Sequence, residues 1–142
     1  MATVAVSSYG TLLKIGDGGG SEVFTTIGEV RDISGPGFAL GTEEVSAHDG
    51  SGWREFIPTL KEGGEVTFKI NFNKATTQGF TGGLYIDFVN KTKRNFQLVL
   101  PTTVAATAAF AAHVVGYPFD LPVEGAITAD ITLNITGAVT WS

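Results

Sequence analysis

Two histidines and one adjacent pair of glutamates are the side chains of this 142-residue chain that offer most for catalysis or metal binding. His48 precedes Asp49 in an expected loop, an arrangement that suits a surface turn or two ligands of a weak metal site. Because no third ligand lies nearby in the sequence, the surface turn is favoured. His113 lies within an apolar segment, where a hydrogen-bonded histidine in the core or at an interface is expected.

The spacing of the acidic and serine residues does not support an enzymatic mechanism. Glu43 and Glu44 are neighbours in an expected strand, so their side chains point to opposite faces and cannot share a proton. No serine has the sequence context of a nucleophile elbow. The sequence therefore predicts that the protein is not an enzyme and uses neither a cofactor nor a metal ion.

The glycine-rich segment 16–22, GDGGGSE, has the composition of a ligand-binding loop but not its pattern. A Walker-type phosphate loop needs Lys followed by Ser or Thr after its glycines, whereas Ser21 and Glu22 follow here. A calcium loop needs alternating acidic ligands, and Asp17 stands alone. A hinge is therefore expected, and residues 1–22 are predicted to be a flexible N-terminal segment.

Length and composition are those of a single globular domain covering residues 1–142. Apolar residues make up 43% of the chain and charged residues 16%, so a packed core is expected rather than disorder. The formal net charge of -5 and the single basic cluster, residues 91–94, argue against a DNA-binding surface. The absence of cysteine excludes disulfides and thiolate metal sites.

Signals for export and membrane insertion are missing from the two segments that resemble them most. The N-terminal sequence MATVAVSSYGTLLKIG lacks the basic segment and the unbroken apolar run of a secretory signal. The apolar stretch VAATAAFAAHVV is shorter than a membrane span and is interrupted by Thr and His. We therefore expect the protein to fold in a cytoplasm and to have no membrane partner.

Period-two alternation of apolar and polar residues predicts two long β-strands, at residues 65–73 and 127–136. Their polar faces consist of Thr, Asn, Asp, Glu and Lys, which is typical of the solvent side of an antiparallel sheet. Further strands are expected at residues 23–33, 38–46, 95–100 and 110–118, with turns at 34–37 and 120–125 and a loop at 102–108. The apolar residues of 23–33 are three apart, so a bulge near Gly28 or a short helical turn is an alternative there.

Residues 74–91 are the one segment with the pattern of a helix. Phe80, Leu84 and Phe88 recur every four residues and give an apolar stripe that can pack on a sheet. Three glycines in the segment each weaken the helix by about 1 kcal/mol relative to Ala. Together these elements predict a mostly β fold, an antiparallel β-sandwich or barrel with one flanking α-helix.

Residues 46–63 form a long connection that contains Gly and Pro and carries several large apolar side chains. In a monomer such a connection normally keeps polar residues at the surface. It is either an assembly arm that is buried in another molecule, or a loop folded back over its own core. The residue pattern alone leaves both alternatives open.

Several of these segments resemble the tail tube protein, or major tail protein, of long-tailed, non-contractile bacteriophages of the lambda type. The resemblance begins with SEVFTTIGEVRDISGPGF and VSAHDGSGWREFIPTLKEGGEVTFKINF and continues through NFQLVLP and FDLPVEGAITADITLNITG. It extends from about Leu12 to Gly137. The run from the His-Asp pair through WREF to GGEV is the most specific part; the chain has Ala47 before His48 and otherwise follows this run closely.

The resemblance implies a structural virion protein rather than an enzyme. Such subunits are expected to assemble into hexameric rings that stack into a tube around a tape measure protein, with tail terminator and tail tip proteins at the ends. DNA passes through the lumen during ejection without specific binding. The tail would be assembled in the cytoplasm of the bacterial host, and the protein would end up in the virion.

The resemblance also implies roles for particular residues. A lumen lined by small and acidic side chains would repel DNA phosphates, and the exposed apolar arm would dock on a neighbouring subunit or ring. The candidates for inter-subunit contact are Trp53, Arg54, Glu55, Phe56, Ile57, Leu60 and Trp141. The candidates for the lumen are Glu65, Lys69 and Asp130.

Two other functions are compatible with the same pattern. One is the tube subunit of a related secretion or contractile injection system. The other is a soluble β-sandwich module that binds a carbohydrate or protein, which aromatic residues clustered on one solvent-exposed face would favour.

Overall fold

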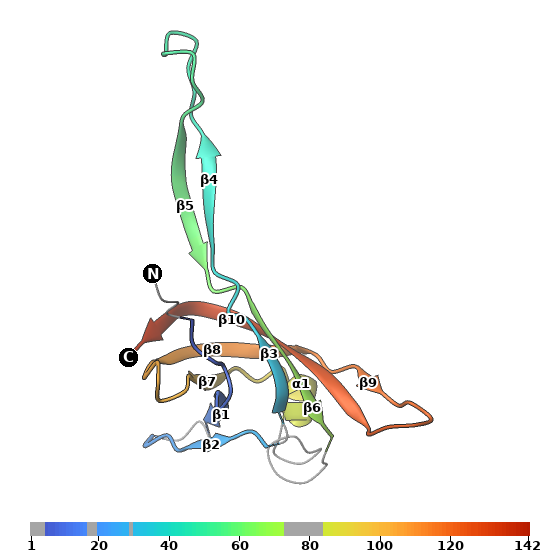
Figure 1. Ribbon diagram of the computed structural model, residues 1–142. Coiled ribbons are helices and arrows are strands. Elements are labelled where there is room, and N and C mark those ends of the chain that lie inside the picture. The colour runs from blue at the N-terminus through green and yellow to red at the C-terminus, as the bar shows by residue number, and fades with distance from the viewer. Residues whose placement is uncertain (1–4, 17–19, 29, 73–83) are drawn as a thin grey trace.

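The computed structural model describes residues 5–16, 20–28, 30–72 and 84–142 (Figure 1). These residues form a body made of an eight-stranded antiparallel sheet and one helix, and a two-stranded hairpin that projects from the body. The mostly β fold with one flanking helix that the sequence predicts is confirmed. The elements are β1 (Leu12–Gly16), β2 (Phe24–Thr26), β3 (Val30–Ser34), β4 (Ala39–Glu44), β5 (Phe56–Glu62), β6 (Glu65–Asn71), α1 (Leu84–Asn90), β7 (Arg94–Val99), β8 (Thr107–Gly116), β9 (Phe119–Asp120) and β10 (Thr128–Trp141).

The large sheet is rolled up. Its strand order is β2-β1-β7-β8-β10-β6-β3, with β9 added beside β10. The two edge strands, β2 and β3, follow each other in the chain with only residues 27–29 between them, so the two edges of the sheet lie close together. The Ile27 N–H donates a hydrogen bond to the Leu13 carbonyl (2.8 Å), which holds this connection against β1. The result is a barrel-like body with the core inside.

The core lies on the inner face of the rolled sheet, where the alternation read from the sequence is confirmed. On β6 and β10 the apolar side chains are buried, while the intervening residues are polar and more exposed. Burying each of these side chains contributes about 1.5–3 kcal/mol. The buried cross-strand pairs are Val66 with Leu133, Phe68 with Ile131, and Ile70 with Ala129.

The other half of the core is formed by β1, β7 and β8. Phe96 on β7 stacks on Phe110 on β8, with ring centroids 5.9 Å apart and planes inclined by 19°. Leu13 on β1 faces Leu98 on β7, and both are buried. Leu84 of α1 is buried as well, so the helix covers this side of the sheet.

The N-terminal segment is more ordered than the sequence predicts. Residues 1–22 are expected to be flexible, yet Leu12–Gly16 forms β1, which lies between β2 and β7 with Leu13 and Ile15 buried. Two apolar residues at a spacing of two are too short a pattern to predict a strand. The strand is stabilised by pairing with β2 on one side and β7 on the other. Residues 17–19 of the glycine-rich hinge lie outside the described part.

Three further elements differ from the predictions. Residues 23–33 form two strands, β2 and β3, because the chain turns near Gly28. The strand expected at 38–46 does not run back along β3; it is β4, which leaves the body and pairs with β5. Residues 46–63 are therefore not one long loop, since 56–62 form β5.

The helix is described from Leu84 to Asn90, and the expected residues 74–83 lie outside the described part. Its C-terminal end is a Schellman motif in which the Lys91 N–H donates to the Phe88 carbonyl (3.4 Å) and the Thr92 N–H to the Asp87 carbonyl (3.0 Å). The helix ends at Asn90, one residue before the end of the predicted segment 74–91.

Candidate assembly interface

The hairpin of residues 38–63, called the arm below, consists of β4 and β5 joined by the connection 45–55. Its cross-strand pairs include Glu44 with Phe56 and Thr42 with Pro58. The Val45 N–H donates to the Glu55 carbonyl (2.8 Å), which extends the ladder past the ends of the strands. Figure 1 shows the arm leaving the body as a thin extension.

Every residue from 37 to 62 is exposed to solvent, although the arm is rich in large apolar side chains. Trp53 is 82% exposed, Leu60 85% and Phe56 54%. An isolated two-stranded hairpin is at best marginally stable in water, and two unpaired strand edges add to its exposure. The alternative that residues 46–63 fold back over their own core is therefore wrong for this chain.

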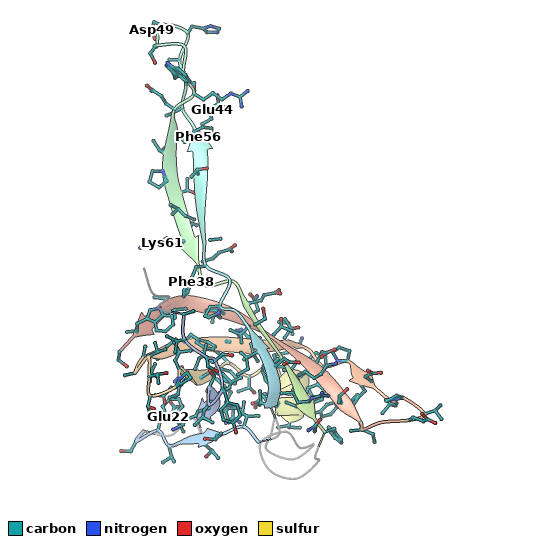
Figure 2. The ribbon with its side chains drawn as sticks, viewed as in Figure 1. Glu22, Phe38, Glu44, Asp49, Phe56 and Lys61 are labelled. Carbon is teal, nitrogen blue, oxygen red and sulfur yellow. The ribbon has the colours of Figure 1, made fainter. Side chains whose placement is uncertain are left out.

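The two faces of the arm have different chemistry. Cross-strand partners share a face, and the register of β4 and β5 shifts between Leu40 and Thr42. The acidic face carries two glutamates and no basic residue: Ala39, Glu43, Ile57 and Glu62. The mixed face carries both charges: Leu40, Thr42, Glu44, Phe56, Pro58 and Lys61; Figure 2 shows side chains standing out from the arm on both sides.

The tip of the arm is held by local polar contacts. The Glu55 N–H donates to Ser46 Oγ (2.8 Å), and the Arg54 guanidinium lies 4.0 Å from Glu44. Both side chains of this ion pair are largely exposed, so it contributes little to stability. Trp53 remains free for a partner because none of these contacts covers it.

The root of the arm is a close crossing of two backbone segments. Gly64 has φ of 74°, and a Cβ at this position would overlap the backbone of Gly37. A Cβ on Gly35 (φ 108°) would likewise meet the Glu65 carbonyl. The Ile135 N–H donates to the Gly64 carbonyl (3.0 Å), tying the crossing to β10. Only glycine permits this approach, so the direction of the arm is set by its root.

Trp141 lies at the root of the arm and not at its tip. Its ring faces that of Phe38, with centroids 6.5 Å apart, and it remains half exposed. Trp141 and the residues of the tip are thus separated by the length of β4 and β5. Whether Trp141 also contacts another subunit stays a prediction.

The three lumen candidates lie on one face of the sheet, opposite the core. Glu65 and Lys69 alternate with the buried residues of β6, and Asp130 pairs with Lys69 across β10. The Lys69 Nζ lies 3.9 Å from Asp130 Oδ1. This outer face continues with Thr67, Asn71, Thr132 and Asn134. Its assignment to the lumen stays a prediction.

A second exposed apolar region, which the sequence analysis treated only as a turn, surrounds β9. It is supported by a chain of aromatic contacts, in which Tyr85 packs against Tyr117, Tyr117 against Phe119 and Phe119 against Phe72. Burial raises the pKa of Tyr117 to about 12. The large apolar residues in and around the turn expected at 120–125 were the sequence signal that could have identified this region. The exposed ones are Phe119, Leu121, Val123 and Ile127.

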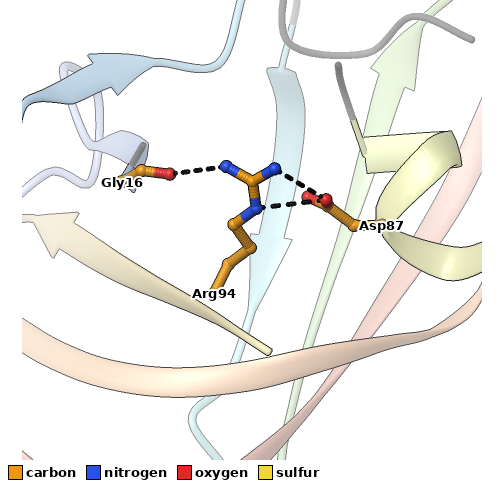
Figure 3. A network of polar contacts seen from close by, with 3 residues as sticks. All are labelled: Gly16, Asp87 and Arg94. Carbon is orange, nitrogen blue, oxygen red and sulfur yellow. Dashed lines mark hydrogen bonds and ion pairs between the residues drawn. The ribbon is translucent and has the colours of Figure 1, made fainter. Parts of the chain in front are cut away.

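The sequence analysis also missed a buried ion pair between Asp87 of α1 and Arg94 of β7 (Figure 3). Arg94 Nε and Nη2 lie 3.1 and 3.0 Å from Asp87 Oδ1, and Arg94 Nη1 donates to the Gly16 carbonyl (3.2 Å). Burial raises the pKa of Asp87, although the charge and the hydrogen bond of Arg94 act in the opposite direction. The pair links three elements of the body.

The residues with catalytic or ligand potential are not brought together. His48 and Asp49 lie at the tip of the arm, whereas His113 lies on β8, opposite Asn134. In the described residues no group of three or more His, Asp or Glu side chains could hold a metal ion. Among the same residues, no helix is long and apolar enough to cross a membrane.

A rolled sheet with one helix and a projecting hairpin places the chain in the tail-tube fold. Similar chains occur in the tail of an empty gene transfer agent particle with C6 symmetry (TM-score 0.78, 17% identity, 97% of this chain and 99% of that chain). They also occur in the sheath–tube complex of the PVC extracellular contractile injection system in its extended state (0.66, 16%, 98% and 92%). A third is found in the SPP1 tail tube (0.67, 13%, 92% and 75%).

No protein-family model and no curated protein matches the sequence. At these identities the structural similarity shows a shared fold. The tail-tube fold expected from the sequence is thereby confirmed, and the lambda-type subclass stays a prediction.

Proposed function

We propose that this protein is a structural, non-enzymatic subunit of a phage tail tube of the non-contractile, lambda type. Copies assemble into hexameric rings, and the rings stack into a tube around a tape measure protein. Terminator and tip proteins close the two ends, and DNA passes through the lumen during ejection. Assembly takes place in the cytoplasm of the bacterial host, and the tube becomes part of the virion.

The strongest support for the proposal is the exposed apolar surface of the arm. Exposed large apolar side chains on both faces of a hairpin, together with two open strand edges, need a partner surface for each face. A subunit in a stacked ring has neighbours in its own ring and in the next one. Such an assembly supplies those surfaces without any partner other than further copies of the chain.

The outer face of β6 and β10 supports a lumen that does not retain DNA. Its side chains are short and polar, and the positive charge of Lys69 lies beside the negative charge of Asp130. Glu65 adds a negative charge that no described basic side chain within ion-pair distance balances. A ring repeats this pattern around the channel, so phosphates meet a surface that is neutral to weakly acidic.

Electron microscopy of the purified protein at increasing concentration tests the proposal. Rings or tubes with six-fold symmetry are the expected result. A protein that stays monomeric at every concentration, and in the presence of a tape measure protein, would contradict it. A monomer that binds a sugar or protein would instead support the β-sandwich binding module.

A tube subunit of a contractile injection system is the second candidate, because chains of such systems share the fold over nearly the whole length. The two differ in what covers the tube: a contractile system surrounds it with a sheath. Mass spectrometry of purified particles distinguishes them. A sheath subunit present in amounts similar to this protein would support the contractile system, and bare tubes would support the non-contractile tail.

A further inference from the structure

The end of α1 and the turn that follows it form a small exposed surface, in which the Phe88 ring also contacts that of Tyr85 (centroids 6.5 Å apart). Phe88 is 42% exposed and Val89 50%, and both flank the exposed side chains of Lys91 and Lys93. We call these four residues the helix patch. In the described part of the chain, no carboxylate forms an ion pair with either lysine. Arg94, the third basic residue of this cluster, instead forms an ion pair with Asp87 of the same chain.

Lys91 occupies a position that normally belongs to glycine. Its φ is 57°, and it lies at the C′ position of the Schellman motif that ends α1. A residue with a Cβ is disfavoured in this left-handed conformation. A lysine in this strained conformation, with no ion-pair partner among the described residues, points to a charge used in a contact with another molecule.

The acidic face of the arm has the complementary chemistry. It combines Glu43 and Glu62 with Ile57, and no basic residue shares this face. Glu62 of β5 lies opposite Ala39, which is four residues, or roughly 13 Å, from Glu43 along β4, and flexible lysine side chains can reach across such a spacing. On the mixed face, by contrast, Lys61 and the ion pair of Arg54 with Glu44 already balance the acidic charge.

We propose that the acidic face of the arm of one copy docks on the helix patch of a neighbouring copy. Ile57 packs against Phe88 and Val89, and Glu43 and Glu62 pair with Lys91 and Lys93. The inference rests on the proposed tube function and specifies one of its contacts. The arm cannot reach its own helix patch, because it leaves the body while α1 is part of the body (Figure 1).

Charge reversal on both sides tests the docking. Glu43→Lys with Glu62→Lys, and separately Lys91→Glu with Lys93→Glu, are each expected to raise the concentration needed for tube assembly at least about tenfold. The four substitutions combined are expected to restore assembly to within about threefold of the wild type. Singly reversed variants that assemble like the wild type, or a combination worse than either, would overturn the proposal.

Two controls separate this contact from a general effect of charge. Arg31→Glu and, separately, Asp32→Lys on β3 reverse exposed charges elsewhere and are expected to leave assembly unchanged. Lys91→Gly relieves the backbone strain while removing the charge, so it should give a more stable subunit that assembles less well. A Lys91→Gly variant that assembles as well as or better than the wild type would contradict the proposal.

The outcomes also distinguish the docking from the tube function. If the wild type forms tubes and none of the charge reversals weakens their assembly, the tube function is supported and the helix patch is not part of the interface. Wild-type protein that never assembles would remove both.

Discussion

Asp87 and Arg94 form a buried ion pair that fixes α1 to the sheet. One carboxylate oxygen of Asp87 accepts from both Nε and Nη2 of Arg94, and the remaining donor group of Arg94 reaches the Gly16 carbonyl at the end of β1. The other oxygen, Asp87 Oδ2, is buried without a hydrogen-bond partner in the described part of the chain. A partly satisfied buried carboxylate depends strongly on its one cation.

Replacing Arg94 by Met should therefore destabilise the body severely. The substitution leaves the Asp87 charge unpaired and removes the donor to Gly16, which together are expected to cost about 3–5 kcal/mol. Urea unfolding of the two proteins measures the difference. A double substitution, Asp87→Leu with Arg94→Met, should recover most of the loss, and a double variant as unstable as the single one would contradict the role of the pair.

The same variant should respond to pH in a defined direction. Burial raises the pKa of Asp87, and Arg94 is the group that opposes this increase. Without Arg94 the pKa rises further, so the folded protein holds the proton to higher pH than the unfolded chain does. Stability is then lost as the pH rises through this pKa. The gap between wild type and Arg94→Met should be smaller in mildly acidic buffer than at neutral pH.

The close backbone crossing at the root of the arm should make Gly64 sensitive to substitution. Gly64→Ala introduces a Cβ at a positive φ and against the backbone of Gly37, whereas Gly137→Ala introduces one at a similar φ (85°) in open space. Placing a Cβ at a positive φ costs about 1 kcal/mol in either variant. At Gly64 the overlap with the backbone of Gly37 should add at least as much again. Thermal unfolding compares the two variants. Equal losses would mean that the crossing tolerates a shift of the backbone.

Strands that bury one face could be predicted from the sequence, because burial of one face makes apolar and polar residues alternate along the strand. Residues 65–71 and 128–136 show this directly, since every second side chain enters the core. The arm lacks such a period, because neither of its faces is buried in the chain and the register of its two strands shifts between Leu40 and Thr42. Its large apolar residues were recognised, but its hairpin structure was not.

The remaining differences come from contacts between distant segments. β1 is stabilised by pairing with β7, which lies about eighty residues further along, and no local pattern of residues 1–22 contains that information. The pair of Asp87 with Arg94 is similar: the predicted apolar stripe places Phe88 on the sheet, whereas Asp87 is buried beside Leu84 and Phe88 is exposed. Topology decides these features, and a single sequence does not provide it.

Trp53 at the tip of the arm is expected to matter for assembly and not for folding. Its side chain is almost free of contacts within the chain, so Trp53→Ala should change the free energy of unfolding by less than about 0.5 kcal/mol while blocking tube formation. Trp53→Phe keeps a large apolar ring at the same position, is expected to assemble, and is the control. Circular dichroism and electron microscopy provide the two measurements. A Trp53→Ala variant that polymerises normally would remove the tip from the interface.

Lys91→Gly should stabilise the isolated subunit by about 1 kcal/mol, because glycine adopts the left-handed conformation at the end of α1 without a steric cost. Thermal unfolding of the monomer measures this effect separately from assembly. Lys93→Gly, at a position without a positive φ, serves as the comparison and should not stabilise. A Lys91→Gly subunit no more stable than the wild type would mean that the lysine is not strained.

Asp130→Asn tests the outer face of β6 and β10 as the wall of the lumen. Asp130 is the carboxylate beside Lys69, so its neutralisation leaves a free ammonium group at the same position of every subunit. In a hexameric ring, six such groups would form a basic belt that retains DNA phosphates. Tubes of the variant are expected to hold DNA in low salt and release it as the salt concentration rises, whereas wild-type tubes do not hold it. Thr132→Asn, on the same face, changes no charge and is the control. If Asp130→Asn tubes hold no more DNA than this control, the outer face of β6 and β10 does not line the channel.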